Sequence, residues 1–235
     1  MMRPLSLLLL VGTLHTPLFS GDKQAASARE ALQPFNDLVG VWRGTGIPSG
    51  TREEQQKGFW TETLECEWQF KGGDAWIKIV FDKGKYYTSG ELRYLPGKGS
   101  FELVLQTLSK EKVSFIGKLQ NKVLALDRTT DKDVQRLVFT LLHPNRFLYR
   151  YEVRPAEKTF FSKVYQVGAT KEGVPFATGD GKPECIVSGG LGTMAVSYKG
   201  QTYYVCCGGC RTEFLEDPEK YIKEYEAKKS KSKGK

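Results

Sequence analysis

The chain has 235 residues, of which 40% are hydrophobic and 26% are charged, as is ordinary for a soluble globular protein. Its formal net charge is +8, but the last eight residues hold five lysines, and Arg3 holds one further charge. With these six set aside a net charge of +2 remains, which does not favour binding to nucleic acid. No uninterrupted run of about 18 apolar residues is present, so we expect no membrane-spanning helix.

The first twenty residues have the three-part layout of a secretory signal. Arg3 precedes a run without charge, Leu5 to Leu14, and Thr16, Pro17 and Ser20 end that run. Ten residues are too few to cross a bilayer as a helix. We therefore expect residues 1–20 to be a signal peptide that directs export to the periplasm or the medium. Cleavage is expected after Ser20 or, further along, at Ala26-Ser27-Ala28.

Residues 35–168 are typical of a β-meander. In Trp60–Phe70 large apolar side chains alternate with Thr, Glu and Gln, which predicts a strand with one buried face. Similar runs recur as far as Thr159–Val167, with turn-forming residues between them and no helical stretch. Counting Val39–Thr45, the pattern predicts about ten short antiparallel strands. Closure into an up-and-down barrel would hide their edges.

The start of this region carries a more specific signal. Gly40 to Gly46 reads Gly-x-Trp-x-Gly-x-Gly, which resembles the first strand of lipocalin-like barrels, including the nitrobindin-like group. The resemblance implies that Trp42 closes the base of the barrel and that the interior holds an apolar ligand or haem. The identity of any barrel ligand remains unknown from the sequence.

The barrel residues that could carry chemistry are few. His143 is the only histidine after the signal, and its His-Pro-Asn turn favours a solvated side chain over a haem ligand. Cys66 lies on the apolar face of its strand and fits a buried core cysteine. Glu62 is the one carboxylate on that face, and a single carboxylate is weak support for acid–base catalysis. We therefore predict no catalytic residues.

A second unit follows a Gly- and Pro-rich linker at 169–182. Residues 183–226 are predicted to form a small α+β unit. It contains a hairpin of Met194–Tyr198 and Gln201–Val205, a short helix at Arg211–Glu216, and a further helix that begins at Pro218. The lysine-rich end at 227–235 is expected to be a disordered basic tail, because it has too little apolar surface to fold.

Three cysteines of this unit are spaced for a common site. Cys185 is followed by twenty residues, Cys206, three residues and Cys210. The hairpin is expected to fold the turn at Glu184–Gly190 back onto Cys206–Cys210, the knuckle of the unit. Within the knuckle, Gly208 and Gly209 let the chain curl. Amides at the start of the following helix favour thiolates, and thiolates favour soft ions such as Zn²⁺ or Cu⁺. A unit of this size also has little core, so a metal ion would stabilise it.

The spacing and its flanks, Tyr198 to Cys206 and Phe214-x-x-Asp-Pro-Glu-Lys-Tyr221, resemble the TRASH domain, a relative of the YHS domain. The resemblance implies heavy-metal trafficking, sensing or resistance, with Cys185, Cys206 and Cys210 as the metal ligands. Many related knuckles have a second cysteine where this chain has Ser188. Three ligands leave an open position on the metal. Cys207 is the candidate fourth ligand, although its side chain is expected to point away when that of Cys206 points in.

The sequence thus predicts an exported, non-enzymatic protein that binds a soft metal ion. Two alternatives for the cysteines stay open: a disulfide of Cys185 with Cys206 or Cys210, which export favours, and a redox role. A different function also stays open, in which the barrel carries an apolar small molecule and the cysteine unit is a structural appendix. A haem-barrel enzyme is a third and weaker possibility.

Overall fold

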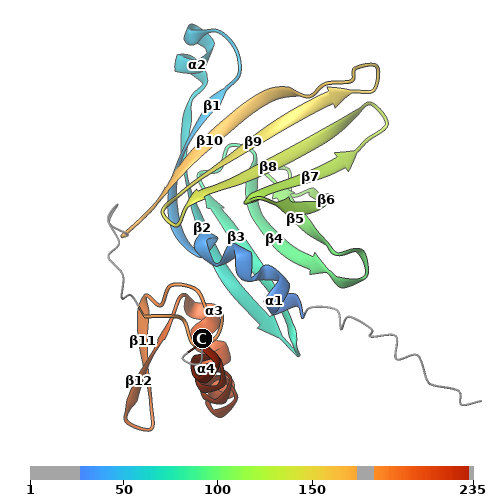
Figure 1. Cartoon of the computed structure of the whole chain (residues 1–235). Coiled ribbons are helices and arrows are strands. Elements are labelled where there is room, and N and C mark those ends of the chain that lie inside the picture. The colour runs from blue at the N-terminus through green and yellow to red at the C-terminus, as the bar shows by residue number, and fades with distance from the viewer. Residues whose placement is uncertain (1–26, 174–182, 233–235) are drawn as a thin grey trace, which may run out of the picture.

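The computed structural model describes residues 27–173 and 183–232. The expected signal peptide therefore lies outside the described residues, as do most of the linker and residues 233–235 of the tail. The described chain forms a β-barrel with a smaller unit at one of its ends (Figure 1). Among the described residues, no helix has the length and the apolar character needed to cross a membrane.

The barrel is closed by ten antiparallel strands in sequence order, and β1 pairs with both β2 and β10. This confirms the mainly β fold and the barrel. The strands are β1 (Gly40–Pro48), β2 (Trp60–Lys71), β3 (Asp74–Asp82), β4 (Tyr87–Leu95), β5 (Ser100–Thr107), β6 (Lys112–Gln120), β7 (Val123–Thr129), β8 (Asp133–His143), β9 (Arg146–Pro155) and β10 (Ser162–Lys171). A single-turn helix, η2 (Pro96–Lys98), joins β4 to β5.

The strand register keeps every second side chain inside the barrel, as the alternation in Trp60–Phe70 predicts. Leu64, Cys66 and Trp68 of β2 are 2% exposed or less. Strand β10 continues beyond the expected barrel end at 168, because Ala169 pairs with Gly44 of β1 and its side chain is buried. The first three residues of the expected linker are therefore part of the barrel wall.

One end of the barrel is plugged by the N-terminal segment. Helix α1 (Ala28–Leu32) begins with a capping box, in which Ser27 and Glu30 bond each other's backbone amides, and η1 (Gln33–Leu38) follows it. Trp42 is buried at this end, as the lipocalin-like resemblance implies. Its indole N–H donates to the Leu38 carbonyl at 2.7 Å, and its ring meets the Phe147 ring edge-on. The aromatic side chains and the plug together close the base.

One helix was not expected between the strands. Helix α2 (Arg52–Gly58) follows β1 and begins with a second capping box, formed by Thr51 and Glu54. The Lys57 and Glu53 side chains also pair across one turn of the helix, at 2.7 Å. None of the helix residues is buried, so the helix has no apolar stripe that would mark it in the sequence. Local capping, rather than core packing, accounts for it.

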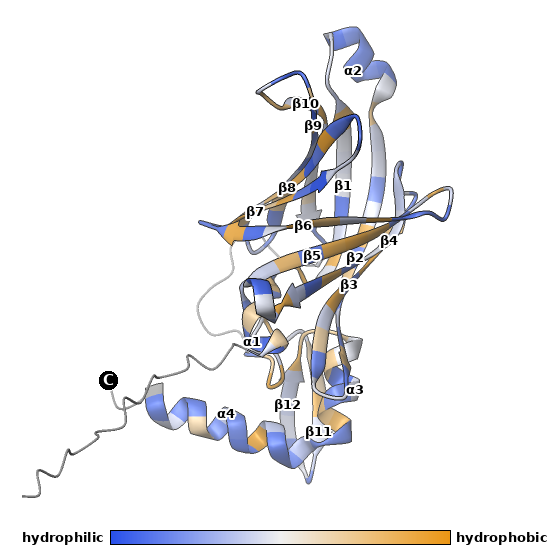
Figure 2. Cartoon of the chain, turned by 90° about the vertical axis from the view of Figure 1, so that its right-hand side faces the viewer, coloured by the Kyte–Doolittle hydropathy of each residue, from blue (hydrophilic) through white to orange (hydrophobic). Residues whose placement is uncertain are grey.

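The C-terminal unit consists of the hairpin of β11 (Met194–Tyr198) and β12 (Gln201–Val205), followed by α3 (Gly208–Glu216) and α4 (Pro218–Ser232). The hairpin strands have the predicted bounds, whereas α3 begins three residues earlier than expected. Figure 2 shows that α4 is mostly hydrophilic along its length. Its apolar side chains that pack on the core are Tyr221, which is 1% exposed, and the partly buried Ile222 and Tyr225.

Helix α4 corrects the expectation of disorder at 227–235, since residues 227–232 are helical. Two contacts explain the difference. The Lys228 ammonium bonds the Glu184 carboxylate, which lies 44 residues earlier in the chain. The Lys229 ammonium lies 4.6 Å above the ring of Tyr225, one turn away. These lysines therefore extend a helix that is already anchored at its start.

Candidate metal centre

The structure brings the three predicted cysteines together from three segments. Cys185 lies in the turn before the hairpin, Cys206 directly follows β12, and Cys210 lies in the first turn of α3. Their sulfur atoms all lie within 4.8 Å of one another. Those of Cys206 and Cys210 are 3.5 Å apart, well beyond the S–S bond length of about 2.05 Å. All five cysteines are free thiols, so the arrangement is a thiol cluster and not a disulfide.

Backbone hydrogen bonds hold the first turn against the hairpin. The Ile186 amide donates to the Tyr204 carbonyl at 2.9 Å, and the Thr193 amide donates to the Val205 carbonyl at 2.9 Å. The turn itself is closed by the Cys185 amide, which donates to the Gly190 carbonyl at 2.7 Å. As a result Cys185 lies beside the residue that ends β12, and the twenty-residue spacing becomes a contact.

Ser188 belongs to this cluster, at the position where many related knuckles have a second cysteine. It is fully buried. Its amide donates to the Cys185 sulfur at 3.5 Å, and its hydroxyl lies 3.4 Å from the Cys206 sulfur. Amide and hydroxyl donors of this kind stabilise negative charge on sulfur. The sequence offered one signal for this role, since Ser188 lies three residues after Cys185 in a tight turn.

The thiols in the cluster share hydrogen bonds, and these shift their pKa values in opposite directions. Hydrogen bonds from Cys206 and Cys210 lower the pKa of Cys185. The pKa of Cys206 is raised because its proton is held by Cys185 and Cys207, and the pKa of Cys210 is raised chiefly by burial. Hydrogen bonds from Cys206 and Cys210 also lower the pKa of Cys207. The cluster therefore favours thiolates at Cys185 and Cys207 beside thiols at Cys206 and Cys210. A soft cation that replaces the protons would find its ligands already gathered.

The other two cysteines lie outside this triad. The Cys207 sulfur is buried and lies 3.9 Å from that of Cys206, but it does not belong to the group of three sulfurs that lie within 4.8 Å of one another. Cys66 lies on β2, and burial raises the pKa of its thiol to about 12. Cys66 is thus a core residue of the barrel, as expected, while Cys207 stays beside the triad.

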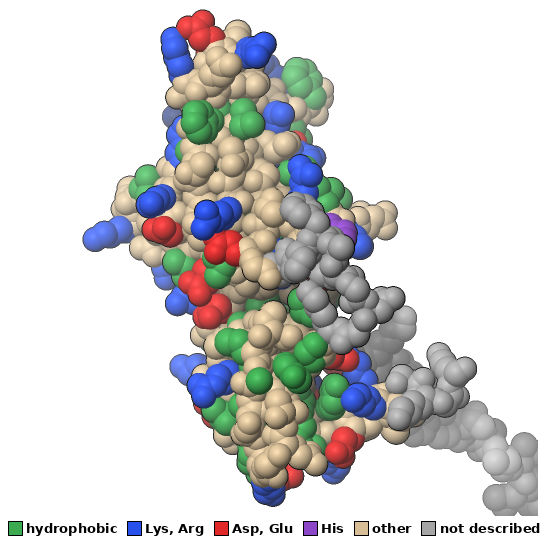
Figure 3. Space-filling view, turned by 90° about the vertical axis from the view of Figure 1, so that its left-hand side faces the viewer, with side chains coloured by type: hydrophobic (Ala, Val, Ile, Leu, Met, Phe, Trp, Pro, Cys, Tyr) green, Lys and Arg blue, Asp and Glu red, His purple; other side chains and the backbone are tan. Residues whose placement is uncertain are grey.

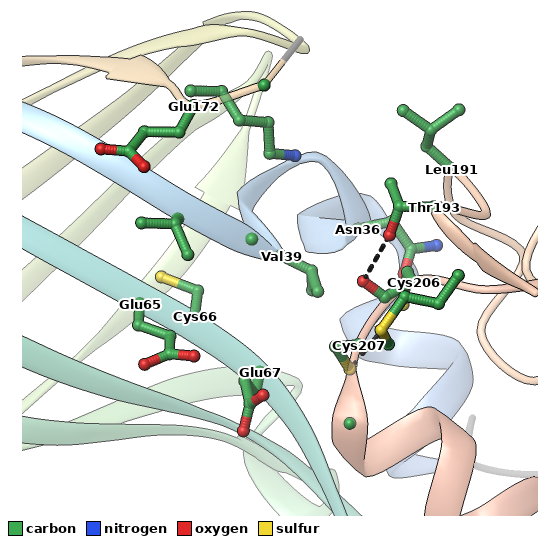
Figure 4. A pocket seen from close by; sticks show the side chains of 16 residues that line it. Asn36, Val39, Glu65, Cys66, Glu67, Glu172, Leu191, Thr193, Cys206 and Cys207 are labelled. Atoms are coloured by element: carbon green, nitrogen blue, oxygen red, sulfur yellow. Dashed lines mark hydrogen bonds between the residues drawn. The ribbon is translucent and has the colours of Figure 1, made fainter.

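A cavity separates the triad from the base of the barrel (Figure 4). Its volume is about 480 Å³, and Cys206 and Cys207 line it on one side. Lys171 and Glu67 line it from the barrel side. Cys185 and Cys210 are fully buried, whereas Cys206 is half-buried. The cavity therefore meets the triad at Cys206.

The C-terminal unit packs closely on the barrel next to this cavity. The Asn36 amide group donates to the Ser188 carbonyl at 2.9 Å, and its oxygen accepts from the Trp68 indole at 3.1 Å. Asn36 thus links the turn that carries Cys185 to strand β2. At the same junction α3 begins directly on β2, where Gly209 faces the Trp68 carbonyl. Figure 3 shows the junction from the side, with apolar side chains gathered on the unit below the barrel.

Gly209→Ala is expected to lower the free energy of unfolding by about 1–3 kcal/mol. A Cβ at this position would lie 1.6 Å from the Trp68 carbonyl oxygen, so helix and strand must move apart. Gly208→Ala is the matched control, because its Cβ would meet only the Glu67 carboxylate, at an ordinary 3.4 Å. Thermal unfolding of the two variants compares them. Equal stabilities would contradict the close packing of α3 on β2.

The two remaining candidates of the barrel have structural surroundings. His143 is the exposed last residue of β8, next to the turn into β9, and its ring nitrogen bonds the Asn145 side chain at 2.7 Å. It is a solvated turn histidine, as expected. Glu62 is 4% exposed, and it accepts hydrogen bonds from the Tyr149 hydroxyl and, at 2.9 Å, from the Trp60 indole. These bonds satisfy a buried carboxylate.

Comparison with known proteins identifies a domain in the C-terminal unit. Residues 193–225 match the YHS domain. The matched segment includes Cys206 and Cys210, and it begins eight residues after Cys185. Among solved structures, the chain is similar to the S-type phycobiliprotein lyase CPES from Guillardia theta, with 9% identity and a TM-score of 0.34. That alignment covers 60% of this chain and 92% of the lyase. No curated protein matches the chain.

Proposed function

We propose that this chain is an exported, non-enzymatic protein that binds one soft metal ion, Zn²⁺ or Cu⁺, through Cys185, Cys206 and Cys210. Its role would be in trafficking, sensing or resistance to a heavy metal. The observation that carries the proposal is the convergence of the three sulfur atoms within 4.8 Å. A tetrahedral site with Zn–S bonds of about 2.3 Å places its sulfurs roughly 3.8 Å apart, so small movements would complete the site.

The surroundings of the triad favour transfer or sensing over a purely structural ion. Three protein ligands leave one position of a tetrahedral metal open to water or to a ligand from a partner. Cys206, the half-buried ligand, borders the cavity beneath the barrel. A metal donor or acceptor would approach the triad from this side. The two fully buried ligands would hold the ion during the exchange.

Export is the part of the proposal that rests on residues 1–20. Cleavage after Ser20 would keep Ser27, which caps helix α1 together with Glu30. Cleavage at Ala28 would remove this cap and expose the start of the plug. The structure of α1 therefore favours the earlier cleavage site.

N-terminal sequencing of the exported protein should give Gly21 as its first residue. The reason is the polar break after the apolar run, together with the need to retain the Ser27 cap. A mature chain that begins at Arg29 would place the cleavage at the later site. Cytosolic protein that retains Met1 would contradict export.

Fully reduced protein is expected to take up one equivalent of Zn²⁺ or Cu⁺ at micromolar concentration. Binding should release protons, because Cys206 and Cys210 are protonated in the metal-free cluster and metal ligation needs thiolates. The apparent affinity should therefore fall as the pH falls. Elemental analysis gives the stoichiometry, and competition with a chromophoric chelator at several pH values gives the affinity.

Failure to take up either ion would reject the metal-binding proposal. The alternative function, carriage of an apolar small molecule in the barrel, would then replace it, with the cysteine unit as a structural appendix. A disulfide would reveal itself as loss of thiol titre without reductant, so the thiols are counted before each titration.

A further inference from the structure

The end of the barrel opposite the cysteine unit holds a second cavity. Its volume is about 240 Å³, and it lies among the first residues of β4, β6 and β8 and the last residues of β5 and β7. Tyrosine side chains form much of its wall, with Arg128 and Gln135 as its charged and amide-bearing residues. None of the residues that line it is acidic. The cavity is therefore aromatic and rich in hydrogen-bond donors.

Tyr165 provides a donor that has no acceptor in good hydrogen-bond geometry. Its side chain is 2% exposed, and its ring stacks with Tyr86 at 4.4 Å and with Tyr151 at 5.4 Å between ring centroids. Its hydroxyl is buried and makes no hydrogen bond of ordinary geometry, and the Tyr87 hydroxyl is the neighbour that interacts with it. Burial raises the pKa of Tyr165, and it raises that of Tyr151 to about 12, so both phenols keep their protons. A buried donor of this kind is suited to an acceptor that comes from outside the chain.

Arg128 provides the positive charge. Arg128 lies on the same face of β7 as the buried Leu124 and Leu126, which is the inner face of the barrel. Its guanidinium donates to the Gln135 side chain at 3.1 Å. Within the described residues, no carboxylate forms an ion pair with it. Arg136, in contrast, bonds both carboxylate oxygens of Asp127, at 2.7 and 2.8 Å. The guanidinium of Arg128 thus has only a neutral partner and keeps donors available.

We propose that this cavity binds a small aromatic carboxylate, with its ring among the tyrosine rings and its charge at Arg128. The hydroxyl of Tyr165 is the second donor to that charge. The volume is below the range of drug-sized sites, which begins at about 300 Å³, and so fits a ligand with one ring. A planar guanidinium suits a carboxylate, which it can bond through two N–H groups. This proposal does not depend on metal binding, since the triad lies at the other end of the barrel.

Benzoate and benzamide test the proposal with the full, reduced chain. The two probes have the same ring and similar size, but only benzoate is charged. Isothermal titration calorimetry should show benzoate binding at least tenfold tighter than benzamide. Arg128→Gln should abolish this preference. Arg146→Gln, which changes an exposed arginine at the start of β9, should leave it intact.

Tyr165→Phe separates a binding role from a structural role. The variant keeps the stacked ring and removes only the hydroxyl. We expect benzoate to bind about tenfold more weakly, while the melting temperature stays the same or rises. The proposal is overturned if benzoate does not bind at millimolar concentration, or if benzoate and benzamide bind equally. Unchanged benzoate affinity in a folded Arg128→Gln variant would overturn it as well.

Discussion

Replacing Cys206 or Cys210 by serine is expected to abolish metal binding. Each change leaves two of the three sulfurs that lie within 4.8 Å. A serine hydroxyl is a harder ligand and does not ionise at neutral pH, so it does not replace a thiolate. The measurement is the metal content of fully reduced protein after dialysis, together with competition against a chelator. Retention of one equivalent by either variant would show that the triad is not the site.

Cys66→Ser is the control for this experiment. It also removes a buried thiol, but from strand β2 of the barrel, and should leave one equivalent of metal bound. Cys207→Ser tests the candidate fourth ligand. Because the Cys207 sulfur lies outside the triad, we expect the affinity of this variant to stay close to that of the parent protein. A clear loss would make Cys207 the fourth ligand and the site a closed one.

Replacing Trp42 by alanine is expected to lower the free energy of unfolding by about 3–5 kcal/mol. Trp42 is 1% exposed, donates to the Leu38 carbonyl and packs against Phe147 at the closed base. The alanine variant would leave a cavity beneath the plug, and the Leu38 carbonyl would lose its hydrogen bond from the indole. This loss is a large share of the stability of about 5–15 kcal/mol that is typical of a folded domain. Chemical denaturation of both proteins measures it.

Trp76→Ala gives the matched comparison, since it removes the same side chain from the outer face of β3. Trp76 is only half-buried, and its main contact is the Arg93 guanidinium, 4.1 Å above its ring. The expected loss is about 1 kcal/mol. If Trp42→Ala costs no more than Trp76→Ala, then Trp42 does not support the base of the barrel.

Much of the barrel was predictable because the signal for a half-buried strand is local. Alternation of apolar and polar residues, as in Trp60–Phe70, reports which side chains face inward without any knowledge of the neighbouring strand. The turn residues between the runs separate the strands. The bounds of β10 were not predictable in the same way, since Ala169 belongs to the strand only through its pairing with Gly44.

The helices show where local signals were missed or were not enough. Helix α2 had a capping box at Thr51 and Glu54 in its sequence, but no apolar stripe drew attention to it. The end of α4 looked like a charged tail, and its helical structure is supported by the contact of Lys228 with Glu184. That contact joins residues 44 positions apart, so no window of the sequence contains both.

The sequence by itself determined the strand pattern and the three cysteines, because residue spacing alone limits which thiols a hairpin and a knuckle can bring together. Only the tertiary structure decided what surrounds them. Ser188 joins the thiol cluster through the fold of its turn, and Asn36 ties that turn to Trp68 of the barrel. In the same way, the register of β7 places Arg128 on the inward face, but the absence of an acidic residue from the described lining of its cavity depends on six other strands. Such contacts are made between distant segments, and their partners are fixed by packing rather than by spacing.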